Sequence, residues 1–511
     1  MPDIILSTLN ARYIHASMGL RYLLANMAEL QPATELIEFN INGRAIDMAE
    51  TLLNKQPKII GLGVYIWNAC ETLELVQLLK TISPDTVIVL GGPEVSYEFE
   101  QQALVSHADY VITGQADIAF KELCTDLLSG KKPINKIIHP LPFELSEIAL
   151  PYAWYNDEDI SNRVIYVEAS RGCPFKCEFC LSSLDKTVYP IDIELFLGEM
   201  ETLYQRGVRH FKFVDRTFNL KAETSIRIMR FFLDKMDADN SQQLFLHFEL
   251  IPDHLPEKLK STIAEFPAGS LQFEIGIQSL NPEVQQTISR KQNTEKVKQN
   301  LHWIRQHSQA HIHADLIIGL PGETIDSFAR GLNQLSAMNP HEIQVGILKR
   351  LRGTPIIRHT DDYAMRYNPQ PPYNILSNSL ISFSEMQQLS RFARYWDLII
   401  NSGRFTQTVP VLLGTQQNAE NRAFENFFKL SQWLFAATGQ THKISLERLF
   451  ALLYQGMCEE LQLDAQQVES ALLQDFAQSG IKGEAKFLRG NTIKSESKRI
   501  QAAQRQQRHS L

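Results

Sequence analysis

Residues 164–180 read VIYVEASRGCPFKCEFC, an apolar run that leads directly into three closely spaced cysteines. The cysteines are Cys173, Cys177 and Cys180, in the pattern C-x3-C-x2-C, and no fourth cysteine lies near them. Thiolates are soft ligands typical of zinc and of iron–sulfur clusters, and four of them would close a site. Three thiolates therefore predict a cluster of four irons in which one iron stays open to bind a substrate.

Two other interpretations of these cysteines remain open. Structural zinc sites usually combine two C-x2-C pairs, whereas Cys177 and Cys180 form one pair and no second pair follows. Cysteines without any ligand, buried in a core, are the other possibility. The spacing favours the iron–sulfur interpretation over both.

The apolar run at 164–168 is the first of six predicted strands, each followed by polar residues. The others are expected at 211–214, at 244–248, at 271–279, within 314–324 and at 342–348. Helical stretches such as Pro282–Gln306 lie between them, so the pattern predicts a partial (β/α)6 TIM-like barrel. Active sites of such barrels lie at the C-terminal ends of the strands, which is where the cysteine loop begins.

Upstream, residues 3–130 alternate apolar strands with amphipathic helices. Strands are expected at 4–9, 36–40, 59–66, 87–90 and 110–113, with helices such as 19–30 and 72–81 between them. This alternation predicts an α/β domain with a doubly wound, flavodoxin-like (Rossmann-type) parallel sheet. Ligands bind such sheets at the C-terminal ends of the strands.

The cysteine spacing, with Phe179 directly before the last cysteine, resembles that of radical S-adenosylmethionine (SAM) enzymes. The strings EIGIQS at 274–279 and DLIIGLPGET at 315–324 match further elements of that family's core. The resemblance implies a [4Fe-4S] cluster on the three cysteines, with SAM bound to the open iron. The residues implied for SAM are Phe179, Asp215, Glu274, Gln278, Arg290, Ile318 and Gly319.

The resemblance also implies separate roles for these residues. Asp215 matches the polar residue that bonds the SAM amino group, Glu274 and Gln278 match an element near the ribose and carboxylate, and Ile318 with Gly319 matches the element beside adenine. Arg290 is expected to pair with the SAM carboxylate, because a guanidinium fork suits a planar anion. Taken singly, Asp215 or Arg290 could instead be a surface ion-pair residue.

The first domain resembles the cobalamin (B12)-binding domain that precedes many radical SAM enzymes. The residues implied for cobalamin lie in loops at the sheet edge and are Tyr13, His15, Gly63, Tyr65, Gly91, Gly92 and Gly114. Gly91 and Gly92 would line the slot for the nucleotide tail. The family signature D-x-H-x-x-G is not matched fully, because Tyr13 stands where Asp is expected and His15 lies four residues before Gly19. A sheet that has lost its cofactor and only supports the barrel is the alternative.

Proline-rich connections and the loss of the strand pattern divide the chain. We expect a cobalamin-binding-type domain at 1–135, a linker at 136–160, the barrel at 161–370 and a helical C-terminal domain at 371–511. The C-terminal helices are predicted at 384–401, 420–437, 445–461 and 465–479, with Ser384 and Ser445 as N-caps. Residues 482–511 turn basic and predict a solvated tail.

Composition restricts the compartment and the partners. The chain of 511 residues is 44% hydrophobic and 21% charged, with a net charge of −8, which makes nucleic-acid binding unlikely. No apolar run is long enough to span a membrane, and the start of the chain does not read as a signal peptide. Six cysteines, three of them clustered, predict a reducing compartment and a cytoplasmic protein.

The sequence thus predicts a radical SAM enzyme with an uncharacterised helical C-terminal domain. A [4Fe-4S] cluster would cleave SAM to a 5′-deoxyadenosyl radical that attacks an unactivated carbon, and cobalamin would permit C-methylation, rearrangement or cyclisation. The alternatives are a radical SAM enzyme without cobalamin that modifies RNA or a metabolite, and a non-catalytic iron–sulfur sensor. An electron donor such as flavodoxin or ferredoxin is expected as a partner, besides a small-molecule or macromolecular substrate.

Overall fold

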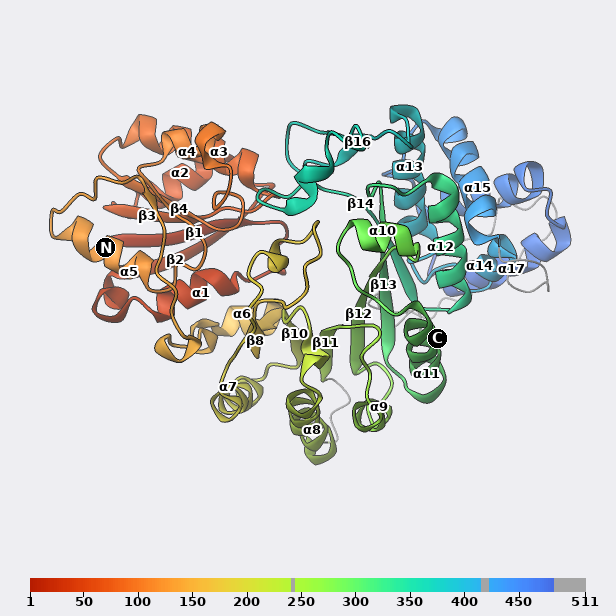
Figure 1. Ribbon diagram of the computed structural model, residues 1–511, viewed down its shortest axis with the longest axis horizontal. Helices are drawn as coiled ribbons and strands as arrows, with labels where there is room; N and C mark the ends of the chain where they lie inside the picture. The colour runs from red at the N-terminus through yellow and green to blue at the C-terminus, as the bar shows by residue number, and fades with distance from the viewer. Residues whose placement is uncertain (240–243, 415–421, 482–511) are drawn as a thin grey trace.

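The computed structural model describes residues 1–239, 244–414 and 422–481 and places three parts side by side (Figure 1). An N-terminal sheet with its helices lies at one end, an open barrel in the middle, and a group of C-terminal helices at the other end. The predicted basic tail and the first residues of the helix predicted at 420–437 lie outside the described residues. Among the described helices, none is long and apolar enough to cross a membrane.

The N-terminal sheet is parallel throughout and has the strand order β2-β1-β3-β4-β5-β6. Its strands are β1 (Ile4–Asn10), β2 (Thr34–Asn40), β3 (Ile59–Gly63), β4 (Val87–Gly91), β5 (Tyr110–Ile112) and β6 (Ile137–Ile138). Its helices are α1 (Met18–Ala25), α2 (Ala45–Leu53), α3 (Ala69–Ile82), α4 (Ala103–His107) and α5 (Ala119–Leu128). Separate apolar cores fill the two faces of the sheet, so the doubly wound prediction is confirmed.

Strand β6 was not predicted, and it lies within the expected linker. Its two residues, Ile137 and Ile138, pair in parallel with Val111 and Ile112 of β5. A run of two apolar residues is too short to give a period-two signal in the sequence. The first sheet therefore extends past residue 135 before the chain turns toward the barrel.

The second sheet is also parallel, with the order β14-β13-β12-β11-β10-β7, and its two edge strands do not pair. Its strands are β7 (Ile165–Val167), β10 (His210–Phe213), β11 (Phe245–Leu250), β12 (Leu271–Gln278), β13 (His311–Ile318) and β14 (Glu342–Ile347). The helices of this part are α6 (Asp157–Asn162), α7 (Ile193–Gln205), α8 (Ala222–Asp239), α9 (Glu257–Ala264), α10 (Pro282–Thr287), α11 (Thr294–His307) and α12 (Ile325–Ala337). The predicted partial (β/α)6 barrel is confirmed.

Alternation along the barrel strands separates an apolar from a polar face. Phe213, Phe248 and Phe273 are fully buried on the face that carries the helices, and the ring of Phe218 stacks on Phe248 with centroids 3.9 Å apart. Successive side chains of a strand point to opposite faces, so the residues between them line the inside of the barrel. Those inner positions hold ionisable groups, as described below.

One predicted helix is divided in two. The stretch Pro282–Gln306 forms α10 and α11, which are separated by a turn in which Ser289 has a positive φ of 55°. This break brings Arg290 to the mouth of the barrel. The sequence contains no proline or glycine there, so the break could not be read from it.

The C-terminal helices pack directly on the barrel and share its core. They are α13 (Phe383–Ile399), α14 (Thr408–Leu413), α15 (Ala423–Thr438), α16 (Leu446–Gln455), followed by a π-helical turn at Gly456–Glu460, and α17 (Ala465–Gln478). Ser445 caps α16 as predicted, but the cap of α13 is Ser382 rather than Ser384. Ser382 and Glu385 form a capping box, which the S-x-x-E spacing would have indicated.

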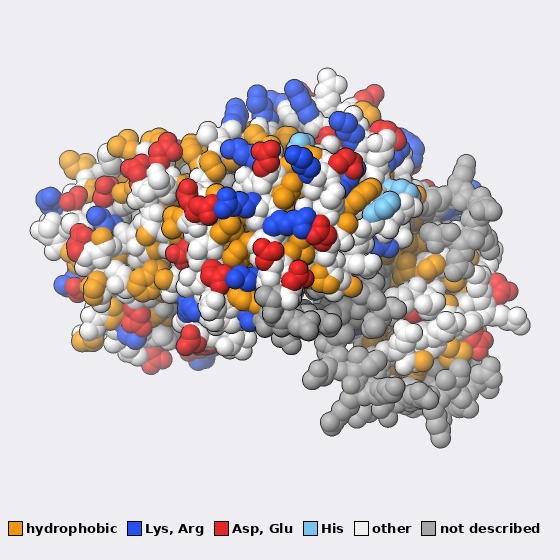
Figure 2. Space-filling view, turned by 90° about the horizontal axis from the view of Figure 1, so that it is seen from below, with side chains coloured by type: hydrophobic (Ala, Val, Ile, Leu, Met, Phe, Trp, Pro, Cys, Tyr) orange, Lys and Arg blue, Asp and Glu red, His pale blue; other side chains and the backbone are white. Residues whose placement is uncertain are grey.

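The outer helices of the barrel present a mixed surface of acidic and basic side chains (Figure 2). Ion pairs join neighbouring helices there: Arg227 of α8 to Glu194 of α7, and Arg230 of α8 to Glu265, which caps the C-terminus of α9. These side chains are about half exposed, so each pair contributes little to stability.

Candidate functional site

The cysteine loop is held at both of its ends. Strand β8 (Ser170–Arg171) pairs in antiparallel fashion with β9 (Tyr189–Pro190), and the three cysteines lie in the loop between them. Gly172 starts this loop with a φ of +90°, and a Cβ at that position would lie 1.9 Å from the backbone oxygen of Thr187. Only glycine permits this close approach, so the loop depends on it.

Cys173, Cys177 and Cys180 line a single cavity of about 230 Å³ at the mouth of the barrel. In the described ranges no three His, Cys, Asp or Glu side chains converge closely enough to hold one metal ion. A four-iron cluster does not require such convergence, because each thiolate binds a different iron. Three thiolates around one cavity, without a fourth, therefore fit a cluster with one open iron better than a zinc ion.

Arg290 brings a positive charge to the same cavity. Its Nη1 lies 3.4 Å from Sγ of Cys177, and its Nη2 donates to the backbone oxygen of Gly276. Gln278 reaches the cavity through an irregularity in β12, where the register shifts between Gly276 and Gln278 and Gln278 has a φ of +70°. Irregularities of this kind re-aim a side chain at the end of a strand.

Carboxyl groups form the inner wall of the cavity. Burial drives the pKa of Glu274 upward, but the hydrogen bond from His247 at 3.0 Å and the charge of Lys212 outweigh it, and the pKa falls to about 2. Burial raises the pKa of Glu249 to about 7, although Arg216 donates to it at 2.7 Å. Burial also raises the pKa of Asp315, which Glu274 and Glu249 raise further. The wall thus combines one carboxylate of lowered pKa, Glu274, with two carboxyl groups of raised pKa, Glu249 and Asp315.

The structure brings together four of the seven residues predicted for SAM. Phe179, Glu274, Gln278 and Arg290 line the cavity with the cysteines. Ile318 and Gly319 do not: Ile318 is 1% exposed in the core, and a Cβ on Gly319 would lie 2.5 Å from the side chain of Ile375.

Asp215 also lies outside the cavity. Its carboxylate accepts hydrogen bonds from the backbone nitrogen of Ala169 at 3.0 Å and from Oγ of Ser170 at 2.6 Å. It is 2% exposed, and burial raises its pKa to about 7. Asp215 therefore holds the turn from β7 into the cysteine loop, instead of the predicted contact with the SAM amino group. Its neighbour Arg216, which was not predicted, lines the cavity.

A second cavity, of about 310 Å³, lies at the C-terminal edge of the first sheet. Five of the seven residues predicted for cobalamin line it, namely Gly63, Tyr65, Gly91, Gly92 and Gly114. Leu20, Val89, Ile112 and Phe120 give it an apolar floor. We call it the glycine cavity. A largely apolar cavity bordered by glycines at the ends of strands could hold the nucleotide tail of cobalamin.

The glycines of this cavity are needed for different reasons. Gly92 has a φ of +107°, and a Cβ there would lie 2.4 Å from the backbone oxygen of Val64, so its own backbone packing requires glycine. A Cβ on Gly91 would meet nothing closer than 3.8 Å. Gly91 and Val89 occupy alternate positions of β4 and share the cavity face, so a side chain at Gly91 would enter the cavity.

Tyr13 and His15 do not line the glycine cavity. Nδ1 of His15 is 2.6 Å from the hydroxyl of Tyr166, and His15 forms a parallel bridge with Val164 beside β7. Tyr13 donates to Glu158 at 2.6 Å. Both residues therefore join the first domain to the barrel, and neither contacts the cavity predicted for the corrin cofactor.

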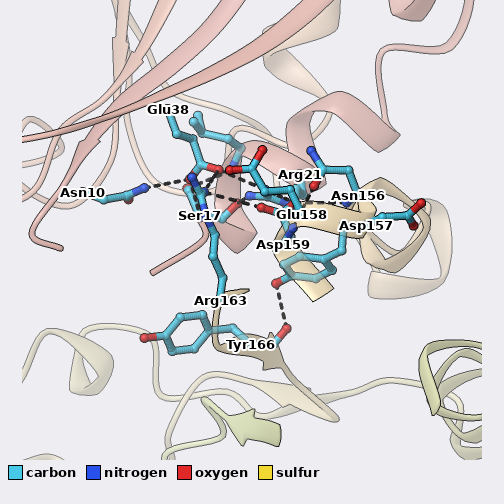
Figure 3. A network of polar contacts seen from close by, with 12 residues as sticks. Asn10, Ser17, Arg21, Glu38, Asn156, Asp157, Glu158, Asp159, Arg163 and Tyr166 are labelled. Atoms are coloured by element: carbon cyan, nitrogen blue, oxygen red, sulfur yellow. Dashed lines mark hydrogen bonds and ion pairs between the residues drawn. The ribbon is translucent and has the colours of Figure 1, made fainter. Parts of the chain in front are cut away.

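A buried ion-pair network lies next to this junction (Figure 3). Nη2 of Arg21 lies 2.9 Å from Glu38 and 2.7 Å from Asp159, and Arg163 also reaches Glu38 at 2.9 Å. The side chains of Arg21, Glu38 and Asp159 are 2–4% exposed. Because the network joins β2 and α1 to α6, it fixes the first sheet against the start of the barrel.

Three family models match consecutive parts of the chain. The B12 binding domain matches residues 5–124, the Radical SAM superfamily matches 167–335, and a protein of unknown function (DUF4080) matches 361–510. The chain therefore carries a B12-binding domain, a radical SAM domain and a DUF4080 domain, in agreement with the sequence prediction.

Two relatives are methyltransferases by name. The chain is 25% identical to the uncharacterized methyltransferase PH0819 of Pyrococcus horikoshii over 335 residues, which are 60% of this chain and 70% of that protein. It is 23% identical to the cobalamin-dependent radical SAM methyltransferase TokK of Streptomyces tokunonensis over 369 residues, 64% of this chain and 52% of that protein. The match thus spans only about half of TokK.

The fold is similar to that of a solved enzyme. The cobalamin-dependent S-adenosylmethionine radical enzyme OxsB, solved with aqua-cobalamin and S-adenosylmethionine, superimposes with a TM-score of 0.62 and 13% identity. The similarity covers 94% of this chain and 84% of OxsB. At this identity it shows that the two chains share their architecture.

Proposed function

We propose that this chain, a radical SAM protein with a B12-binding domain before its barrel and a DUF4080 domain after it, is an enzyme that uses both cofactors on an unactivated carbon, with C-methylation as the reaction. One observation carries the proposal: strand β8, which leads directly into the cysteine loop, forms part of the wall of the glycine cavity. Arg171, two residues before Cys173, lines that cavity together with Gly91 and Gly114. The sites for the two cofactors are therefore built on one continuous piece of chain.

Cys173, Cys177 and Cys180 would hold the [4Fe-4S] cluster, and Arg290, Gln278 and Glu274 would hold SAM beside it. When bound, the cluster supplies the electron that cleaves SAM, and cobalamin supplies the methyl group that reaches the substrate carbon. The names of the relatives support methyl transfer over rearrangement or cyclisation.

The side chains of the cavity would position and shield the reaction. Cys173 and Cys177 are nearly buried, which limits the access of water to the loop. Arg290 would neutralise the SAM carboxylate, because its Nη1 lies 3.4 Å from Sγ of Cys177, beside the cluster to which SAM would bind. Glu249 would hold a proton on its carboxyl group near pH 7, since burial raises its pKa to about 7. An electron donor such as flavodoxin or ferredoxin would deliver the electron.

The test is anaerobic reconstitution of the full chain with iron, sulfide and hydroxocobalamin, followed by reduction with dithionite in the presence of SAM. We expect 5′-deoxyadenosine, S-adenosylhomocysteine and cobalamin that stays with the protein through gel filtration. Deoxyadenosine without retained cobalamin would favour a radical SAM enzyme that lacks cobalamin. A four-iron spectrum with neither product, in wild type, would favour a non-catalytic sensor.

A pair of glycine variants sharpens the test of the cobalamin site. Gly91→Leu should prevent retention of cobalamin and leave the iron content unchanged, because its side chain would enter the glycine cavity. Gly198→Leu is the matched control, since Gly198 lies exposed on α7 with no atom near its Cβ position. Equal cobalamin retention by the two variants would place the cofactor elsewhere.

A further inference from the structure

A short connection after the last barrel strand contacts one loop beside each candidate cofactor site. Residues Lys349–His359, here called the connecting segment, follow β14 and lie between the parts matched by the radical SAM and DUF4080 models. The segment ends in a 3-10 turn at Pro355–His359. Its contacts reach two regions that are far away in the sequence.

The first region is the loop that leaves β4 at the glycine cavity. Arg350 donates through Nη1 and Nη2 to the two carboxylate oxygens of Glu98, both at 2.9 Å. The backbone nitrogen of Gly353 also donates to Glu98, at 3.1 Å. These three bonds fix Glu98 although it has a left-handed φ of 49°.

A second acid of the same loop is bound more deeply. Nε of Arg352 donates to Glu94 at 2.8 Å, and the hydroxyl of Tyr373 donates to the same oxygen at 2.6 Å. The side chain of Glu94 is 4% exposed. Glu94 comes two residues after Gly92, which lines the glycine cavity. The connecting segment therefore binds the loop after β4 directly beside the wall of that cavity.

A close backbone contact accompanies these ion pairs. A Cβ on Gly353 would lie 2.4 Å from the ring of Tyr97, and Gly353 has a φ of +78°. The ring of Tyr97 therefore rests on the backbone of the segment, which only glycine allows.

The second region is the cysteine loop. Glu178, between Cys177 and Cys180, accepts a hydrogen bond from Nε2 of His359 at 2.7 Å and is also bonded by Arg358. The backbone nitrogen of Ile356 donates to the backbone oxygen of Glu178 at 2.9 Å. The Glu178 side chain is 3% exposed, so these hydrogen bonds are made to a buried carboxylate.

We propose that the connecting segment is a positioning element that sets the distance between the glycine cavity and the cysteine loop. The proposal rests on the proposed function, in which each of the two sites holds a cofactor. Two surfaces that only pack together could slide by small amounts. Here the ion pairs of Arg350 and Arg352 at one end, and the ion pair of Arg358 with the hydrogen bond of His359 at the other, fix the positions of both loops on one short segment.

Arg350 and Arg352 are the positioning residues to test. Methyl transfer needs reacting groups held close together and aligned, and a displacement of about 1 Å can cost on the order of a hundredfold in rate. Loosening the segment should therefore lower S-adenosylhomocysteine formation more than 5′-deoxyadenosine formation, since only the former depends on both sites.

The decisive measurement is a distance in the full chain. A nitroxide on exposed Cys70 of α3, in a Cys458→Ala background with the cluster assembled before labelling, reports through its spin relaxation how far the first sheet lies from the reduced cluster. The variant Arg350→Gln/Arg352→Gln should show weaker relaxation enhancement than wild type at equal iron content. Arg366→Gln, an exposed arginine of β15 (Arg366–Tyr367), is the matched control and should match wild type.

Further variants separate positioning from folding. Arg350→Lys keeps the charge but loses the two-pronged bond, so it should give an intermediate relaxation value. The exchanged pair Glu98→Arg/Arg350→Glu should recover most of the wild-type value. Unaltered relaxation in Arg350→Gln/Arg352→Gln, with only a lower melting temperature, would overturn the proposal.

Failure of the positioning role can be distinguished from failure of the proposed function. If wild type assembles no cluster, the proposed function fails. Hydrogen exchange of residues 93–98 then still tests the segment in wild type and Arg350→Gln/Arg352→Gln. Faster exchange in the variant would support the proposal that the connecting segment holds this loop in place, and equal exchange would refute that proposal.

Discussion

Arg171 donates through Nη1 and Nη2 to the two carboxylate oxygens of Asp117, each at 3.2 Å. Its Nε donates to Glu168 at 2.7 Å, and its guanidinium lies over the ring of Tyr22 at 4.3 Å. One side chain thus joins the start of the cysteine loop to the wall of the glycine cavity.

The first prediction concerns this link. Arg171→Met should lower the free energy of unfolding by about 3 kcal/mol, because it leaves two buried carboxylates without their cation. Arg171→Met/Asp117→Asn should recover part of the loss. Urea unfolding of the three proteins measures both effects, and an additive double variant would show that the two side chains do not interact.

The second prediction concerns SAM. Arg290→Ala should weaken SAM binding by roughly tenfold to a hundredfold, since a bond to a charged group contributes about 1.5–3 kcal/mol. Calorimetric titration of the reconstituted, oxidised protein measures it. Arg330→Ala, at an exposed position of α12, serves as the control. Equal affinities of Arg290→Ala and wild type for SAM would mean that the SAM carboxylate does not bind to Arg290.

The third prediction compares two glutamates of β2. Glu38→Gln should destabilise the protein by about 3 kcal/mol, because Arg21 and Arg163 would lose their buried partner. Glu35→Gln should cost less than about 1 kcal/mol, because the Glu35–Lys55 pair is exposed. Thermal and urea unfolding test the difference, and similar losses in both variants would contradict the role of the network.

The fourth prediction is a pH dependence. Burial raises the pKa of Glu323 to about 7, although Ser279 at 2.9 Å and Ser327 at 3.1 Å donate to it. Because the pKa is higher in the folded state than in the unfolded state, this carboxyl group lowers stability as pH rises through the interval from about 4 to 7.

Glu323→Gln removes that titration while keeping the shape of the side chain. The free energy of unfolding of Glu323→Gln minus that of wild type should become more positive between about pH 5 and pH 8, by up to roughly 3 kcal/mol. Urea unfolding at the two pH values measures it. A difference that is independent of pH would mean that Glu323 titrates normally.

The strand pattern made most of the fold predictable. Strands β1 and β12 consist of long apolar or alternating runs, and the structure has them within a few residues of the expected bounds. The same reasoning missed β6, whose two residues are defined by pairing with β5 rather than by any pattern of their own. The break before Arg290 likewise depends on tertiary contacts.

The site was predictable where residues stay near the cysteines or within a barrel strand. Phe179, Glu274 and Gln278 reach the cavity, and Glu274 does so because it occupies an inner position of β12. Asp215 lies outside the cavity because the side chains of β10 alternate between its two faces. Lys212 faces inward, so counting by two from it would have selected Arg216. His15 lies away from the glycine cavity because a loop histidine is positioned by whichever partner the fold supplies, here Tyr166.

Glu94 and Glu98 are separated in the chain by more than two hundred residues from the arginines that bind them, Arg352 and Arg350. Glu94 and Glu98 are inherited with the B12-binding domain, and Arg350 and Arg352 with the end of the barrel. A chimera that takes the first domain from another protein would therefore lose all of these ion pairs in one exchange. Across descendants of this chain, we expect a change at Glu98 to be accompanied by a change at Arg350, because the two side chains form an ion pair between the two domains.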